Sequence, residues 1–159
     1  MITLFVLSAL GLALFTISTT PEDPPMAQHD SSDAVLSIGL HPGAVDYSRY
    51  PGLTEDALAA RIAAGEAALR DAGFNLVSCL LPADPAAAEV TLRECLSRGQ
   101  FRAAMIGAGV RMAAEHTVLF ERLVNALVEV APGTRLCFNT SPETTIDALR
   151  RWVEPAPRR

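Results

Sequence analysis

Short apolar runs alternate with helical patterns four times along this 159-residue chain, and this alternation constrains the fold more than any other feature. The apolar runs are Val35–Leu40, Phe74–Leu81, Phe101–Ile106 and Arg135–Asn139. Strand–helix units joined by short loops favour parallel strands, right-handed crossovers and helices on both faces of the sheet. The sequence therefore predicts a small three-layer α/β/α domain of flavodoxin-like or Rossmann-like type. Its four-stranded parallel sheet is expected in the order 2-1-3-4.

Helix start and stop signals separate the apolar runs. Thr54 is expected to cap the first helix, and Gly73 to close it in the left-handed conformation that glycine adopts readily. Asp84 is expected to cap the second helix. The third and fourth helices are expected over Glu115–Val130 and Ser141–Trp152.

The charge of the chain excludes several function classes. Its formal net charge is −5, and every basic residue is an arginine. Without a basic face to neutralise phosphates, nucleic acid is not expected as a partner. The absence of lysine from the sequence excludes a Walker-type phosphate lysine and Schiff-base chemistry.

The cysteines do not suggest a disulfide framework. Cys79, Cys95 and Cys137 form no C-x-x-C pair and are odd in number. We interpret them as small buried apolar residues of a protein in a reducing compartment, which favours a cytoplasmic location.

The amino-terminal segment 1–20 is uncharged and mostly apolar, and a proline-rich stretch follows it. About 20 such residues would span a membrane, so a membrane-anchored protein is one interpretation. Translation from Met26 and a cleaved export signal are the other two. Residues 21–33 are expected to form a linker, 34–153 a single α/β domain, and 154–159 a tail.

Ligands of open α/β sheets bind at the carboxyl ends of the strands where the strand order reverses. In the order 2-1-3-4 this switch point lies between the first and third strands. The first strand leads into a long loop, 41–53, in which His41 and Asp46 are candidates for proton transfer. His41 as a strand terminator and Asp46 as a turn residue are the alternatives.

The third and fourth strands add candidate ligand-binding residues. Gly107 and Gly109 would let a ligand approach the backbone, and Arg111 offers donors suited to a carboxylate or phosphate. Asn139 and Thr140 follow the fourth strand at the same edge. These residues predict an anionic small molecule, held by the glycine backbone and the amino terminus of the third helix.

Known motifs assign no cofactor. The Gly-x-Gly run lacks the third glycine of a dinucleotide fingerprint, and the sequence contains no G-x-S-x-G nucleophile elbow. His41, Asp46, Glu115 and His116 are too loosely spaced to indicate a metal site, and no metal is predicted.

Several short motifs resemble a family of small bacterial and fungal proteins. They are Leu40-His41-Pro42, Pro51-Gly52-Leu53-Thr54, Ile106-Gly107-Ala108-Gly109-Val110-Arg111, Leu119-Phe120-Glu121-Arg122-Leu123-Val124-Asn125 and Cys137-Phe138-Asn139-Thr140. The resemblance covers 35–152 and implies no activity, cofactor or catalytic residue. Whether the chain is an enzyme stays open.

Two functions follow as hypotheses. The first is binding of an anionic small molecule at the crevice between strands one and three. The alternative is a non-catalytic module that forms a homodimer through its third or last helix, since small sheets often cover their edges by oligomerising.

Overall fold

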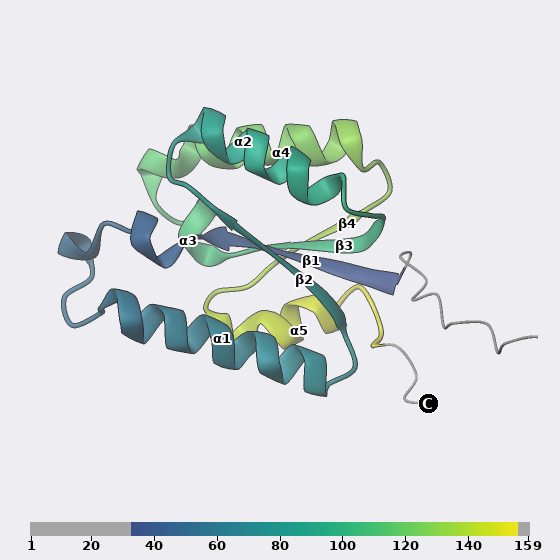
Figure 1. Ribbon diagram of the computed structural model, residues 1–159, viewed down its shortest axis with the longest axis horizontal. Coiled ribbons are helices and arrows are strands. Elements are labelled where there is room, and N and C mark those ends of the chain that lie inside the picture. The colour runs from purple at the N-terminus through teal and green to yellow at the C-terminus, as the bar shows by residue number, and fades with distance from the viewer. Residues whose placement is uncertain (1–32, 156–159) are drawn as a thin grey trace, which may run out of the picture.

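The computed structural model describes residues 33–155. Four strands form one parallel sheet in the order β2-β1-β3-β4, which confirms the predicted topology (Figure 1). They are β1 (Ala34–Leu40), β2 (Asn75–Leu81), β3 (Phe101–Ile106) and β4 (Arg135–Phe138). The apolar segment 1–20 lies outside the described residues, and within 33–155 none of the helices has the length and apolar character to cross a membrane.

Helices cover both faces of the sheet, so the domain has three layers. Figure 1 shows α2 and α4 on one face and α1 and α5 on the other. The α-helices are α1 (Glu55–Asp71), α2 (Pro85–Leu96), α3 (Ala108–Arg111), α4 (Thr117–Val130) and α5 (Thr145–Arg150). Short 3₁₀ turns lie between them: η2 (Pro42–Ala44), η3 (Tyr47–Arg49), η4 (Ala114–His116) and η5 (Pro142–Thr144).

The local signals in the sequence act as expected. The Ala57 N–H donates to the Thr54 hydroxyl at 3.2 Å, and the Ala87 N–H donates to the Asp84 carboxylate at 2.8 Å. Both bonds satisfy donors that a helix amino terminus would otherwise leave unpaired. Gly73 follows α1 with a φ of 91°, the left-handed conformation that suits glycine.

The third helix differs from the prediction. Instead of one helix starting at Glu115, the chain forms the four-residue α3 directly after Gly107, then η4, and begins α4 at Thr117. The His116 ring contributes to this break, because its Nδ1 contacts the Gly109 carbonyl oxygen at 2.7 Å. The long helix α4 therefore does not follow directly on the Gly-x-Gly segment, as the sequence predicts, but begins after α3 and η4.

Two of the cysteines also differ from the prediction. Cys79 of β2 and Cys95 of α2 form a disulfide with a Cα–Cα distance of 6.1 Å, whereas the sequence predicts free thiols. The spacing of the two residues gives no sign of this, because it is the packing of α2 on β2 that brings the side chains together. Cys137 is free and buried as predicted, and its burial raises its pKa to about 11.

The two faces of the sheet carry cores of unequal size. Leu36, Ile38 and Leu40 of β1 belong to the larger core under α2 and α4. Val35 of the same strand faces the smaller core under α1 and α5. Because side chains alternate along a strand, Ser37 and Gly39 also face α1. A central strand thus places large side chains on one face and small ones on the other.

Candidate functional site

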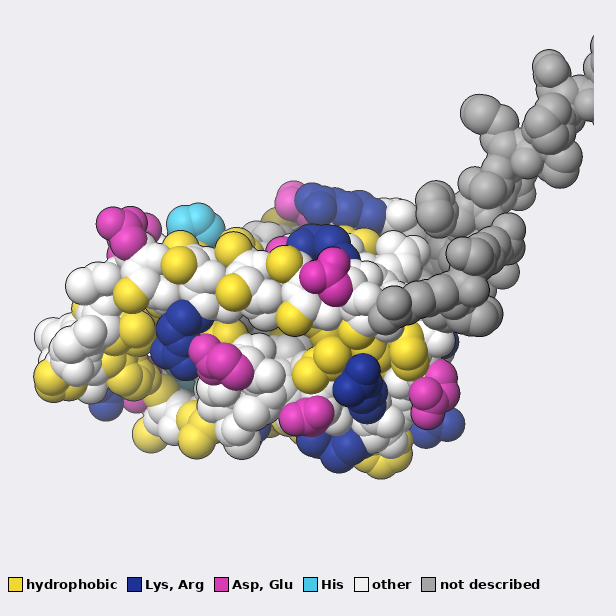
Figure 2. All heavy atoms as spheres, turned by 90° about the horizontal axis from the view of Figure 1, so that it is seen from below, with side chains coloured by type: hydrophobic (Ala, Val, Ile, Leu, Met, Phe, Trp, Pro, Cys, Tyr) yellow, Lys and Arg dark blue, Asp and Glu magenta, His cyan; other side chains and the backbone are white. Residues whose placement is uncertain are grey.

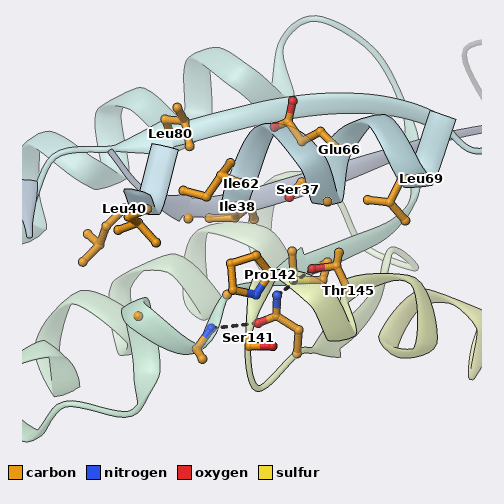
Figure 3. Close-up of a pocket in the computed structure, with 18 of the residues that line it drawn as sticks. Ser37, Ile38, Leu40, Ile62, Glu66, Leu69, Leu80, Ser141, Pro142 and Thr145 are labelled. Atoms are coloured by element: carbon orange, nitrogen blue, oxygen red, sulfur yellow. Dashed lines mark hydrogen bonds between the residues drawn. The ribbon is translucent and has the colours of Figure 1, made fainter. Parts of the chain in front are cut away.

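A cavity of about 130 Å³ lies between α1 and the carboxyl ends of β1 and β3, at the switch point of the sheet. Figure 3 shows side chains from α1, β1 and the segment around η5 directed at this space. Its apolar walls are formed by Ile38, Leu40, Val45, Leu58, Ile62, Leu69, Leu80, Met105 and Pro142. Its size is close to that of apolar cavities that accommodate benzene, roughly 150 Å³.

The cavity exists because small residues lie opposite α1. Ser37 and Gly39 of β1 and Gly107 after β3 all line it. A Cβ added to Gly39 would meet no atom within 4 Å, so the space beside this residue is open. In a closely packed layer this space would be filled by a side chain from the central strand. Here it stays open.

Contacts between α1 and η5 hold α1 in place beside the cavity. The Arg61 guanidinium donates two hydrogen bonds to the Glu143 carboxylate, at 2.7 and 2.9 Å. These bonds hold the pKa of Glu143 far below its usual range, at about 2, and raise that of Arg61. A Cβ at Gly65 would lie 3.0 Å from the Pro142 carbonyl oxygen, so glycine allows α1 to approach η5 closely. Leu69 is the one buried residue of α1.

The surface formed by α1 and α5 carries mixed charge. In Figure 2 acidic and basic side chains are interspersed among apolar ones on this face. The residues lining the cavity include one charged group, Glu66 of α1. Its side chain is 18% exposed and accepts a hydrogen bond from Arg70 at 3.1 Å.

Three of the predicted site residues, Gly107, Gly109 and Asn139, line the cavity together. Asn139 is buried, and its side chain accepts a hydrogen bond from the Ala108 N–H at 2.9 Å and donates one to the Thr145 hydroxyl at 2.7 Å. These bonds join the segment after β3 to the start of α5. Asn139 therefore shapes the wall of the cavity.

The backbone donors expected to hold an anion have partners within the protein. The Gly107 N–H donates to the Ile38 carbonyl oxygen at 2.8 Å, and the Ala108 N–H donates to Asn139. Gly107 thus ties β3 to β1 beyond the end of the strand pairing. An anion at this point would have to displace these bonds.

Arg111 lies outside the cavity. It donates to the Asn139 backbone carbonyl at 2.5 Å, and its guanidinium lies 5.4 Å from the centroid of the Phe138 ring. Its Nε is buried without a hydrogen-bond partner among the described residues. Thr140 also lies outside the lining, and its N–H donates to the Thr144 hydroxyl at 3.0 Å. The hydrogen bonds of both residues therefore stabilise the turn that follows β4.

His41 and Asp46 are placed apart from the cavity, in the turns of the first loop. Nδ1 of His41 accepts a hydrogen bond from the Gly43 N–H at 3.1 Å. Asp46 accepts from both the hydroxyl and the N–H of Ser48, and these bonds lower the pKa of its carboxyl group. Asp46 thus has the turn role that was its alternative, and His41, directly after β1, caps the first turn of the loop.

The four residues weighed as metal ligands are engaged separately. Glu115 forms an ion pair with Arg49, which ties the first loop to η4, and His116 contacts Gly109. Over residues 33–155, no cluster of three or more His, Cys, Asp or Glu side chains is arranged to hold a metal ion.

Sequence reasoning missed the residues that create the cavity. Ser37, Gly39 and Glu66 were not among the candidates, although their positions carried a signal. In Val35–Leu40, every second residue is a large aliphatic, and the residues between them shrink from Val35 to Ser37 and Gly39. Such a pattern on a central strand indicates one filled face and one open face.

The fold and the cavity define a small three-layer α/β domain with an apolar cavity at the switch point of its sheet. No family model, curated protein or solved structure matches this chain. The functional argument therefore starts from the geometry of the cavity.

Proposed function

We propose that this domain binds a small, mainly apolar molecule in the cavity between α1 and the carboxyl ends of β1 and β3. The observation that carries the proposal is the open α1-facing side of β1 at Ser37 and Gly39. A glycine in the interior of a strand costs stability, and filling the space with an aliphatic side chain would add more. A retained cavity at a switch point is the arrangement that ligand sites of open α/β sheets use.

The cavity lining favours a different ligand from the anion expected from the sequence. Among residues 33–155, no arginine lines the cavity, and the one charged lining residue is the carboxylate Glu66. The Gly107 and Ala108 N–H groups already have acceptors. Apolar walls and acceptor groups support binding of a neutral or positively charged molecule.

A thermal-shift panel of small metabolites, sorted by charge, tests this proposal. A ligand at about 100 times its Kd stabilises the folded state by about 2.7 kcal/mol, which raises the melting temperature by several degrees. We expect hits among neutral or cationic molecules with an apolar body, and we expect Gly39→Leu to abolish them. Hits that persist in this variant would place the binding site elsewhere, and a panel without hits would contradict the proposal.

The alternative, a homo-oligomeric interaction module, is favoured by exposed valines on α4. Val118 is 55% exposed and Val128 is 63% exposed. Glu121 and Asn125 lie between them in the helix, so this surface is less apolar than a typical dimer core. Light scattering on the purified protein decides between monomer and dimer. A dimer that Val118→Glu dissociates, with an empty ligand panel, would support the module.

A further inference from the structure

The carboxylate Glu66 occupies a position in α1 where an apolar side chain would be expected. Leu58, Ile62 and Leu69 line the cavity from the same helix, and Glu66 lies within the stripe that they form. A carboxylate on the inward face of a helix loses part of its hydration, which is costly unless a partner compensates for it. A partner within the cavity would serve this purpose.

The partner that the protein itself provides is Arg70, one turn further along α1. Its guanidinium donates to Oε2 of Glu66 at 3.1 Å, and its own side chain is 52% exposed. Arg70 is not among the residues that line the cavity. Glu66 thus lines the cavity and is 18% exposed, while its bonded partner Arg70 lies mostly in solvent.

A second acceptor faces the cavity from the opposite wall. Ser37 of β1 lines the cavity below α1, and a hydroxyl oxygen can accept a hydrogen bond. Figure 3 shows Glu66 and Ser37 among the residues that surround the same space. The cavity therefore combines apolar walls with a carboxylate and a hydroxyl oxygen.

We propose that the ligand of this cavity is a primary amine with an apolar body, bound as its ammonium form, an inference that rests on the proposed function. The apolar body fills the space beside Gly39 and Ile62. The ammonium group donates to the Glu66 carboxylate and the Ser37 hydroxyl. The ammonium group adds the attraction between opposite charges to its hydrogen bond, whereas an alcohol of the same shape makes the hydrogen bond alone, so Glu66 sets the preference for an amine.

Three probes of similar shape test this inference: benzylamine, benzyl alcohol and benzoate. Each is titrated into the 15N-labelled protein at neutral pH, and the Kd is taken from the chemical shifts of the cavity amides. We expect benzylamine to bind about tenfold more tightly than benzyl alcohol, and benzoate to bind most weakly. Benzyl alcohol or benzoate binding as tightly as benzylamine would overturn the inference while leaving the proposed function intact. If none of the probes shifts the cavity amides, the inference fails, and the thermal-shift panel then decides whether the proposed function fails with it.

Three variants assign the preference to Glu66. Glu66→Gln should remove the tenfold preference for benzylamine, whereas Glu94→Gln, the same change on α2 across the sheet, should leave it intact. Arg70→Gln removes the competing cation and should tighten benzylamine binding. A preference that survives Glu66→Gln would overturn the inference, as would an Arg70→Gln variant that weakens binding as much as Glu66→Gln does. The probe series on the unmodified protein holds even if a variant fails to fold.

Discussion

Replacing Gly39 with leucine should stabilise the protein and abolish ligand binding in one step. Gly39 is on the central strand β1, and a Cβ built there meets nothing within 4 Å. Its φ is not in the left-handed region, so a leucine can adopt the same backbone conformation. The new side chain would extend into the cavity below α1.

The size of the effect follows from the burial of the new side chain. Fully burying a leucine contributes about 1.5–3 kcal/mol, and the lower end applies because the cavity opens to solvent. Removing a glycine from a strand adds about 0.5–1 kcal/mol. Together they give about 2 kcal/mol, below the bound of about 3 kcal/mol for closing a sealed cavity of about 130 Å³. For a domain of this size the melting temperature should rise by about 6–8 °C.

A series at Gly39 separates the two contributions. Gly39→Ala removes the glycine but leaves most of the cavity open, and Gly39→Val and Gly39→Leu fill it stepwise. The free energy of unfolding, measured by urea denaturation monitored by circular dichroism, should rise by about 0.8 kcal/mol for each methylene that becomes buried. The slope of the urea transition should stay constant, which shows that the folded state is otherwise unchanged.

The refuting result is a leucine variant no more stable than the alanine variant. It would mean that the side chain does not enter the cavity, or that overpacking cancels the gain. A leucine variant that still shows the ligand-induced thermal shifts of the unmodified protein would separate the cavity from the binding site.

Other sites give further expected outcomes. Gly107→Ala should lower the free energy of unfolding by about 1 kcal/mol in the same urea assay, because its Cβ would lie 3.3 Å from the Ile38 carbonyl oxygen. Asn139→Ala should cost about 2–3 kcal/mol in that assay, since it leaves the Ala108 N–H without an acceptor. Thiol titration in denaturant should find one free thiol before reduction and three after it, and replacing Cys79 and Cys95 with alanine should cost about 3 kcal/mol. Glu143 has a pKa lowered to about 2 from 4.5, so its contribution is complete above pH 4.5 and is lost as the pH falls toward 2. Because the pair is exposed, Glu143→Gln should reduce stability at pH 7 by only about 0.5 kcal/mol, and the difference should vanish in acid unfolding near pH 2.

The fold was predictable because its signals are local and agree with one another. Each strand is a short apolar run, and Thr54, Asp84 and Gly73 mark helix ends in the sequence and in the structure. The strand order follows from the preference for right-handed crossovers with short connections. The location of the cavity at the switch point followed from that topology.

The chemistry at the switch point was less predictable, because residue type does not reveal which partner a side chain finds. His41 and Asp46 form short-range bonds with Gly43 and Ser48 that satisfy turns. Arg111 reaches the Asn139 carbonyl across the loop rather than the cavity. The Cys79–Cys95 disulfide depends on how α2 lies on β2, which a spacing of 16 residues does not specify.

A larger side chain on the α1 side of β1 would stabilise the fold, and its absence is the strongest reason to regard the cavity as functional. Ser37 and Gly39 leave space on the α1 side of a strand whose other face is filled by Leu36, Ile38 and Leu40. Single substitutions at Gly39 can fill that space, and we expect them to stabilise the domain. A structural role alone gives no reason to keep glycine where larger residues fit better, whereas a binding site requires the space. The argument stands if the leucine variant gains about 2 kcal/mol and loses binding, and it fails if stability and binding are lost together.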